Sequence, residues 1–384
     1  MRATRAIIDL GNYRHNLRVI KERLQQADRP RGRPVPGMCV AVKADAYGHG
    51  ATALARVALE EGAEHLGVAT VDEAVRLREA GITAPILLYS LPLPEEVEEV
   101  CRTGISPFVA DEEYCDRLAA AAERVGTTAR IHLKIDTGMG RIGCRPDEAV
   151  SLAGRISSNP NLELAGIATH FPIADAADRS FTEHQIDVFG RTVKDIREAG
   201  VTEGIVHAAN SGAVIAYPAA YFDMVRPGIA TYGYYPSHDQ ERILDLRPVM
   251  QFESRIVFIK TVEPGTSVSY GRTYRASRRT VIGTVPAGYA DGFNRLLSNQ
   301  AEVLVFEGEG ASVRRAAVAG RVCMDQFMID LGPESRARKY DKVVLFGPDP
   351  RGPSGEEIAD LTGTIPYEVT CAVGARVPRV YRDE

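Results

Sequence analysis

One lysine in a glycine-rich segment offers the most direct chemistry in this sequence. Lys43 follows the largely apolar run 38–42 and precedes the turn residues Gly48-His49-Gly50. Lysine is seldom buried without a partner, and a desolvated amine loses its proton more readily than one in water. A neutral amine is a nucleophile toward aldehydes. Lys43 is therefore a candidate for covalent chemistry with a carbonyl compound.

Further reactive or phosphate-binding groups come at the ends of other predicted strands. Taken singly, a histidine or arginine at such a position is more often structural than catalytic. A Ser-Gly pair and a Gly-Ile pair supply a hydroxyl and sterically open amides, which are the groups that bind phosphate at loop ends. Because these groups all come at the ends of predicted strands, together they favour a functional site. These residues are Lys134, Asp136, His170, Asn210, Ser211, Arg226, Gly228 and Ile229.

The elements that must position these residues alternate in type from residue 11 to about residue 230. Short apolar runs alternate with segments of helical period, and eight strands in such an alternation predict a closed parallel barrel of the TIM type. One helix, 11–26, precedes the first barrel strand. In such a barrel the reactive side chains lie at the carboxyl ends of the strands. The predicted strands are 40–43, 65–70, 85–90, 107–110, 129–136, 164–170, 205–210 and 224–229.

After residue 245 the pattern changes to strands joined by Gly, Pro and Asp turns, which is typical of an antiparallel β domain. We therefore predict an α/β chain of two domains, a (β/α)8 barrel over 1–244 and a mostly antiparallel β domain over 245–384. The opening residues are candidates for pairing with the second domain. The predicted strands are 252–262, 279–286, 302–306, 313–319, 327–331, 342–346 and 374–381.

Composition limits the classes of function. The net charge of −5 gives no support to nucleic-acid or acidic-membrane binding, and the basic run 29–34 contains prolines and a glycine typical of a solvated loop. No apolar run approaches the ~18 residues that span a bilayer. The six cysteines lack metal-ligand spacing, which predicts no metal site and a reducing, cytoplasmic compartment.

Several long segments closely resemble alanine racemases, and they come in the order of that family over nearly the whole chain. The resemblance implies a homodimeric isomerase that uses pyridoxal 5′-phosphate to interconvert L- and D-alanine, supplying D-alanine for peptidoglycan. It is less specific for alanine than for the family. The segments are AVKADAYGHG (41–50), HLKIDTGMGRIG (132–143), GIATHF (166–171), ANSGA (209–213), MVRPGIATYGYYP (224–236), VSYGRTY (268–274), GYADG (288–292), GRVCMDQFMIDL (320–331) and TIPYEVTCAVGARVPRVY (364–381).

The resemblance also implies roles toward the cofactor. Lys43 is expected to form the Schiff base, and Arg226 to face the pyridine nitrogen. Because arginine is effectively always protonated and can only donate, that nitrogen is expected to stay neutral. The remaining expected cofactor-binding residues are His170 and Asn210, with the phosphate held by Tyr47, Ser211, Gly228, Ile229 and Tyr367.

Racemisation removes the Cα proton from one face and returns a proton to the other, so it needs two bases. By resemblance Lys43 serves one face, and Tyr270 of the partner subunit, positioned by His170, serves the other. Arg141 and the backbone of the partner subunit's Met324 are expected to bind the substrate carboxylate. Lys134 is the position that such enzymes carbamylate, which makes it anionic and fixes Arg141.

Three alternatives remain open on the sequence. An amino-acid decarboxylase on the same barrel usually needs an acidic partner at the ring nitrogen, which Arg226 disfavours. A pyridoxal-phosphate carrier or homeostasis protein resembles the barrel alone, so the β domain with Tyr270 disfavours it. A serine or broad-specificity racemase is the alternative that the residues exclude least.

Overall fold

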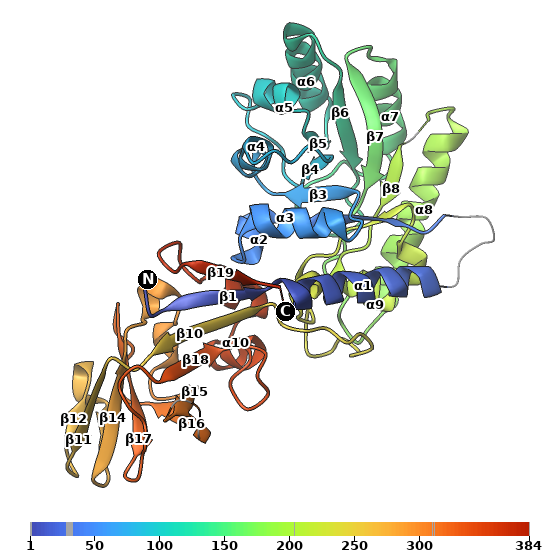
Figure 1. Cartoon of the computed structure of the whole chain (residues 1–384). Coiled ribbons are helices and arrows are strands. Elements are labelled where there is room, and N and C mark those ends of the chain that lie inside the picture. The colour runs from blue at the N-terminus through green and yellow to red at the C-terminus, as the bar shows by residue number, and fades with distance from the viewer. Residues whose placement is uncertain (1, 28–33, 203, 309, 311, 384) are drawn as a thin grey trace.

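The computed structural model describes residues 2–27, 34–202, 204–308, 310 and 312–383, so the basic run 29–34 lies outside the described residues except for Pro34. Eight parallel strands close into a barrel in sequence order, which confirms the predicted TIM-type fold (Figure 1). Each strand is short and buried. The barrel strands are β2 (Gly37–Ala41), β3 (His65–Val68), β4 (Ile86–Leu88), β5 (Ser106–Val109), β6 (Ala129–Lys134), β7 (Leu162–Ala168), β8 (Ile205–His207) and β9 (Met224–Val225).

Helices connect successive strands around the outside of the barrel (Figure 1). The helix at Glu112–Val125 shows how the sequence sets their bounds. Asp111 accepts a hydrogen bond from the Tyr114 amide at the start, and Gly126 takes the left-handed conformation at the end. The helices of this half are α1 (Leu10–Gln26), α2 (Lys43–Tyr47), α3 (Ala51–Glu60), α4 (Val71–Glu79), α5 (Val97–Thr103), α6 (Glu112–Val125), α7 (Ala149–Ser158), α8 (Ser180–Glu198) and α9 (Ser211–Ala216).

The rest of the chain forms a nine-stranded sheet in the order β11-β14-β17-β16-β15-β18-β10-β1-β19, with a separate pair β12-β13. Its strand pairs are antiparallel except β1 with β19. The elements are β1 (Arg5–Asp9), β10 (Met250–Arg255), β11 (Phe258–Val262), β12 (Ser267–Val268), β13 (Tyr274–Arg275), β14 (Thr280–Val285), β15 (Glu302–Glu307), β16 (Ser312–Val318), β17 (Phe327–Gly332), β18 (Lys342–Phe346), β19 (Arg379–Arg382), α10 (Gly355–Thr362) and α11 (Pro366–Cys371).

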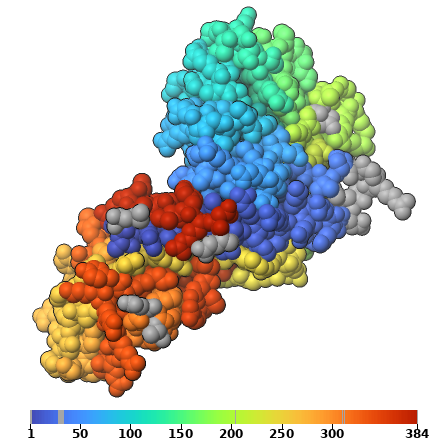
Figure 2. Space-filling view, viewed as in Figure 1, coloured from blue at the N-terminus to red at the C-terminus, as the bar shows by residue number. Residues whose placement is uncertain are grey.

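The start of the chain contributes to both halves. The first strand, β1, lies in the sheet and continues directly into α1, which packs on the barrel side (Figure 1). The N-terminal and C-terminal segments therefore lie side by side between two lobes (Figure 2). The division of the chain after residue 244 stays a prediction.

Several predicted strands of the barrel end too late: those predicted over 205–210 and 224–229 end at His207 and Val225. In the sheet, two predicted strands were also wrong in their bounds. The strand predicted over 252–262 is broken because the Ile256 amide donates to the Asp341 carbonyl and the Val257 amide to the Thr284 carbonyl. β10 therefore stays beside β1 and β18, whereas β11 joins β14. The strand predicted over 374–381 begins only at Arg379, whose side chain bonds the carbonyls of Gly374 and Val377 and curls that segment.

No helix in the described part of the chain is both long and apolar enough to cross a membrane.

Candidate active site

A cavity of about 370 Å³ opens at the carboxyl ends of the barrel strands. Reactive side chains belong at this end of such a barrel. The structure brings eleven of the thirteen predicted site residues to this one cavity, although they come from separate strands and loops. They are Lys43, Tyr47, Lys134, Arg141, His170, Asn210, Ser211, Arg226, Gly228, Ile229 and Tyr367.

A left-handed turn follows Lys43. Residues 44–47 all have positive φ, between 52° and 55°, although none of them is glycine. This conformation costs about 1–2 kcal/mol per residue, so it persists only where surrounding contacts impose it. Contacts of this kind are present: Asp45 Oδ1 accepts from the Ala51 amide, and Glu73 accepts from the Ala44 amide. The turn places both Lys43 and Tyr47 on the cavity wall.

Two amines face the cavity with weakened affinity for protons. Burial, and then the charge of Arg141, lower the pKa of Lys43 below its ordinary value. Burial and then Arg226 lower the pKa of Lys134 to about 7. Both amines therefore reach the neutral, nucleophilic form more easily than a lysine in water.

Arg226 is buried at the centre of this end of the barrel, 5% exposed. Its partners are neutral: Nη2 donates to the carbonyls of Thr169 (2.7 Å) and Ala208 (3.0 Å), and Nη1 lies 2.5 Å from His207 Nδ1. Arginine has only donors, so His207 Nδ1 must accept. The His207 proton therefore sits on Nε2, which donates to His132 Nδ1 at 2.8 Å. Arg226 is fixed by a chain of neutral groups that runs down the barrel.

His170 is also an acceptor for Arg226. Its Nδ1 lies 3.3 Å from Arg226 Nη2, which leaves Nε2 as the protonated nitrogen. Burial and then the Arg226 charge lower the pKa of His170 well below 6.5, so the ring is neutral. The permanent cation of the pair is Arg226.

A cluster of uncharged donors forms another wall. The amides of Gly228 and Ala230 both donate to Ser211 Oγ, at 2.9 and 3.3 Å. A Cβ at position 228 would stand 2.6 Å from Tyr47 Oη, so only glycine lets that hydroxyl approach the loop. The ring of Tyr367 lies 5.8 Å from that of Tyr47. Hydroxyls and amides that converge in this way suit a phosphate group.

The loop after β6 presents Arg141. The Asp136 carboxylate accepts from the amides of Gly138, Met139 and Gly140 and so holds the loop in one shape. Burial alone would raise the pKa of Asp136, but these bonds bring it below its ordinary value. A fixed loop fixes the base of the Arg141 side chain at the cavity wall.

The cavity walls fit pyridoxal phosphate. An amine of lowered pKa, a phosphate-sized cluster of neutral donors and a buried arginine lie around one space, and these match the aldehyde, the phosphate and the ring nitrogen of that cofactor. Each wall comes from a different loop: Lys43 after β2, Ser211 after β8 and Arg226 after β9.

Two of the predicted site residues lie elsewhere. Tyr270 is 70% exposed in the short turn after β12, and Met324 is 53% exposed between β16 and β17. Neither lines the cavity. Both sit in the β sheet half of the molecule, so the structure does not bring them to the lysine of their own chain.

The sequence analysis did not single out Tyr89, Phe108 or His207. The first two line the cavity, and His207 holds Arg226. Tyr89 lines the cavity, and its ring centroid lies 5.9 Å from Lys43 Nζ. Phe108 lines the same wall, and its ring stacks on that of His207, the residue that holds Arg226. All three stand at or near the carboxyl ends of predicted strands, so the strand-end argument used for His170 applies to them as well.

Comparison with known proteins gives one consistent result. The family model "Alanine racemase, N-terminal domain" matches residues 8–236, and "Alanine racemase, C-terminal domain" matches residues 249–381. The chain is 46% identical to the alanine racemase of Treponema denticola over 100% of its own length and 99% of the relative. The solved alanine racemase of Clostridium difficile has a TM-score of 0.92 at 38% identity, covering 100% of this chain and 96% of that one. The Bacillus anthracis alanine racemase, solved with L-Ala-P bound, has a TM-score of 0.89 at 35% identity, with 100% and 95% covered.

Proposed function

The chain belongs to the alanine racemase family of pyridoxal-phosphate-dependent isomerases, and from this premise we propose that its barrel cavity binds pyridoxal 5′-phosphate and racemises alanine. We propose that the D-alanine formed serves peptidoglycan synthesis and that the chain works in the cytoplasm. The observation that carries the proposal is the single cavity in which a lysine of lowered pKa, a phosphate-binding cluster and a buried arginine meet.

When bound, the cofactor draws electron density from the Cα of an amino acid and so makes the α-proton removable. Arg226 Nη and Nε groups can only donate, so this chain keeps the cofactor ring nitrogen neutral. A neutral ring is a weaker electron sink, which favours simple proton exchange over side reactions. Lys43 Nζ, with its lowered pKa, is able to take the proton at one face.

Tyr270 is proposed as the acid/base at the opposite face, in the site of the partner subunit. A phenol with an ordinary pKa of about 10 needs a donor to stabilise its anion near neutral pH. His170 supports this role, because its Nδ1 accepts from Arg226 and its Nε2 proton is left to donate. Arg226 therefore polarises His170, and His170 positions and stabilises the oxygen of the partner subunit's Tyr270.

The substrate carboxylate is proposed to lie between Arg141 and the backbone amide of the partner subunit's Met324. Lys134 is proposed to react with CO₂, forming an N–C bond and releasing one proton, to give an anionic carbamate. A pKa of about 7 supports this, since only the neutral amine adds to CO₂. The new negative charge would then fix the Arg141 guanidinium.

An obligate homodimer follows from the same assignment. The exposed positions of Tyr270 and Met324, away from their own chain's cavity, support a pair in which each β sheet half completes the other's site.

Trapping the cofactor linkage tests the assignment of Lys43. The protein loaded with pyridoxal phosphate is reduced with borohydride and digested, and the labelled peptide is sequenced by mass spectrometry. We expect a single label on Lys43. A label on another lysine, such as Lys134, or no label at all, would contradict the proposed function.

Exchange of the α-proton in heavy water tests the substrate. L-alanine, D-alanine and both enantiomers of serine are incubated with the loaded protein, and deuterium incorporation is followed by NMR. We expect faster exchange with both alanine enantiomers than with serine. Equal rates would favour a broad-specificity racemase, loss of carbon dioxide a decarboxylase, and no exchange a carrier or homeostasis protein.

A further inference from the structure

The loop that carries Met324 is held in one direction by the turn 288–292. Tyr289 N–H donates to the Cys323 carbonyl, and Ala290 N–H donates to the Met324 carbonyl, both at 3.1 Å. The N–H and C=O of a trans peptide point in opposite directions. Since the Cys323 carbonyl faces the turn, the Met324 N–H points away from it. The turn therefore aims the amide that the proposed function assigns to the substrate carboxylate.

This contact needs the two backbones to lie very close. A Cβ at Gly288 would stand 2.3 Å from both the Cys323 and the Met324 carbonyl oxygens. Only glycine permits such an approach. The direction of the Met324 amide thus depends on where the 288–292 turn sits, and the turn needs an anchor.

Asp291 supplies that anchor from within the turn. Its side chain is 0% exposed and accepts from the Gly288 amide at 3.0 Å, from Arg376 Nε at 2.7 Å and from Arg2 Nη1 at 2.6 Å. Burial alone would raise the pKa of the Asp291 carboxyl, yet the bonds from Arg376 and Arg2 bring it below its ordinary value. The carboxylate is therefore charged, and both guanidinium groups belong to the ends of the chain.

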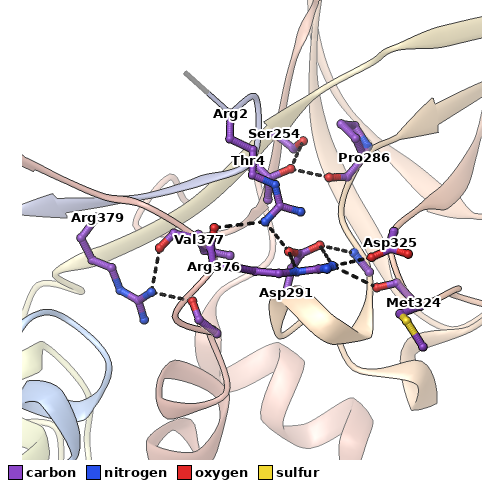
Figure 3. A network of polar contacts seen from close by, with 12 residues as sticks. Arg2, Thr4, Ser254, Pro286, Asp291, Met324, Asp325, Arg376, Val377 and Arg379 are labelled. Atoms are coloured by element: carbon purple, nitrogen blue, oxygen red, sulfur yellow. Dashed lines mark hydrogen bonds and ion pairs between the residues drawn. The ribbon is translucent and has the colours of Figure 1, made fainter.

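Arg376 also reaches the Met324 loop itself. Its Nη2 lies 2.7 Å from Asp325 Oδ1 and 3.4 Å from the Met324 carbonyl (Figure 3). One guanidinium thus bridges the 288–292 turn and the 323–325 loop. Charge-assisted, forked contacts of this kind fix geometry as well as adding energy.

The segment that presents Arg376 is itself fixed. Arg379 donates to the carbonyls of Gly374 and Val377, and its Nε donates to the Gly48 carbonyl at 2.9 Å. Gly48 ends the left-handed turn after Lys43. The C-terminal segment is therefore anchored to the lysine turn of its own chain. The same segment holds the loop that carries Met324 through Arg376 (Figure 3).

We propose that Arg2, Asp291 and Arg376 form a positioning clamp that aims the Met324 amide at the substrate carboxylate in the partner's site. The inference rests on the proposed function, which gives the Met324 amide that task. None of the three side chains touches substrate; they act through the backbone of the 323–325 loop. Through the clamp, Arg2 near the start of the chain also helps to position the carboxylate site, without touching it.

Two small ligands separate this role from general stability. Propanoate has the carboxylate and methyl groups of alanine without the amine, whereas ethylamine has the amine without the carboxylate. Arg376→Met keeps an unbranched apolar stem as far as the position of Nε and removes the donors. We expect the inhibition constant of propanoate to rise about tenfold, as for one lost charge-assisted hydrogen bond. We expect the affinity for ethylamine, followed by the cofactor absorbance, to stay the same.

Hydrogen exchange gives a second readout that needs no catalysis. In the wild type the amides of Tyr289 and Ala290 are bonded to the 323–324 carbonyls. Mass spectrometry of a peptide covering 286–293 is expected to show about tenfold faster exchange in Arg376→Met. Arg376→Lys, which keeps a charge but loses the fork, is expected to fall between the two. Arg2→Met, which leaves Arg376 in place, is the milder variant if Arg376→Met fails to fold, and about threefold changes are expected.

Arg315→Met is the matched control. Arg315 also forms a forked pair with a carboxylate, Glu357, at 2.7 and 3.0 Å, but it contacts neither the turn nor the loop. It should alter neither the propanoate constant nor the exchange of 286–293. Equal weakening of propanoate and ethylamine, or an unchanged propanoate constant in Arg376→Met and Arg2→Met, would overturn the clamp. An inactive wild type with the expected exchange pattern would instead count against the proposed function alone.

Discussion

The two halves of the proposed site are built in opposite ways. Ten residues of the barrel and Tyr367 of α11 already face one cavity, and Arg226 is 5% exposed with neutral partners on both sides. In the β sheet half, Tyr270 and Met324 are 70% and 53% exposed and do not line that cavity. Under the proposed function, the barrel half is preorganised for the cofactor, whereas the β sheet half presents Tyr270 and Met324 outward for a second chain.

The halves also differ in how they hold their charges. Arg226 in the barrel is fixed by carbonyls and imidazoles, so it keeps a net positive charge directed at the cavity. Arg376 in the β sheet half is neutralised by Asp291 and Asp325, and its work is mechanical. In the proposed site, the arginine assigned to the cofactor is held by neutral groups, whereas the arginine assigned to loop positioning is paired with carboxylates.

Mixing two inactive variants is the strongest test of this difference. Lys43→Ala removes the amine of the barrel half, and Tyr270→Phe removes the phenol hydroxyl of the β sheet half. Each variant alone is expected to lose about 10²–10⁴-fold in kcat, the usual contribution of one acid/base group. Unfolded together and refolded, half of the dimers are mixed and hold one intact site out of two, so about a quarter of wild-type activity should return.

Tyr340→Phe is the control for the second variant, because Tyr340 is also exposed, at 66%, and has no assigned role. A mixture of Tyr340→Phe and Lys43→Ala should give more than a quarter of the wild-type activity, because dimers of two Tyr340→Phe chains are also active. If Lys43→Ala and Tyr270→Phe do not restore each other, both bases act within one chain, and the contrast between the two halves fails.

A smaller change should weaken the barrel half alone. Gly228→Ala places a methyl group 2.6 Å from Tyr47 Oη, which is too close for contact. We expect the methyl group to push that hydroxyl out of the phosphate cluster. We expect the dissociation constant for pyridoxal phosphate, measured by absorbance titration, to rise about ten- to hundredfold. The dimer, measured by sedimentation, should be unaffected.

Gly154→Ala is the matched control, because a Cβ there meets nothing within 4 Å and the residue lies in helix α7. It should leave cofactor affinity unchanged. Unchanged affinity in Gly228→Ala as well would mean that the cluster around Ser211 is not the phosphate site.

The sequence predicted the barrel half of the site better than its fine structure. Alternating strands and helices placed Lys134, His170, Ser211 and Arg226 at strand ends, and strand ends meet at one face of a closed barrel. The left-handed turn at 44–47 was not predictable, because four L-residues at positive φ oppose every local preference. Contacts from distant segments, such as that of Glu73 with the Ala44 amide, help to impose that turn.

Contacts across the barrel and across the chain ends were hidden for the same reason. The bond between His207 and His132 joins residues 75 apart and depends on the register of three strands. The opening residues were candidates for pairing with the second domain, but the pairing of Arg2 with Asp291 also depends on the register of β1 in the sheet. Spacing along a sequence carries no information about such pairs, whereas it does carry the period of each strand and helix.

The last expected effect is on stability against pH, where the two halves should lose stability over different pH ranges. Burial lowers the pKa of His132 to about 3 and of His49 to about 4, and it lowers those of His170 and His207 as well. These rings stay neutral in the folded barrel, but they bind protons in the unfolded chain below about pH 6.5. Their contribution is therefore complete above pH 6.5 and is lost as the pH falls, by at most about 1.4 kcal/mol per pH unit for each ring. The Asp291 pKa is lowered, so the clamp loses stability only on acidification below about pH 4.

Urea unfolding between pH 7.5 and 5 measures this slope at a fixed protein concentration. His132→Asn removes one titrating ring but leaves an oxygen to accept from His207, so it should flatten the fall in the free energy of unfolding. His238→Asn is the control. His238 is exposed, and its hydrogen bond to Asp360 raises its pKa, so its small contribution to the free energy of unfolding grows as the pH falls. Asp291→Asn should leave the slope in this range as it is. A wild type whose free energy of unfolding is constant from pH 7.5 to 5 would mean that the buried histidines are charged, and the neutral chain that holds Arg226 would have to be abandoned.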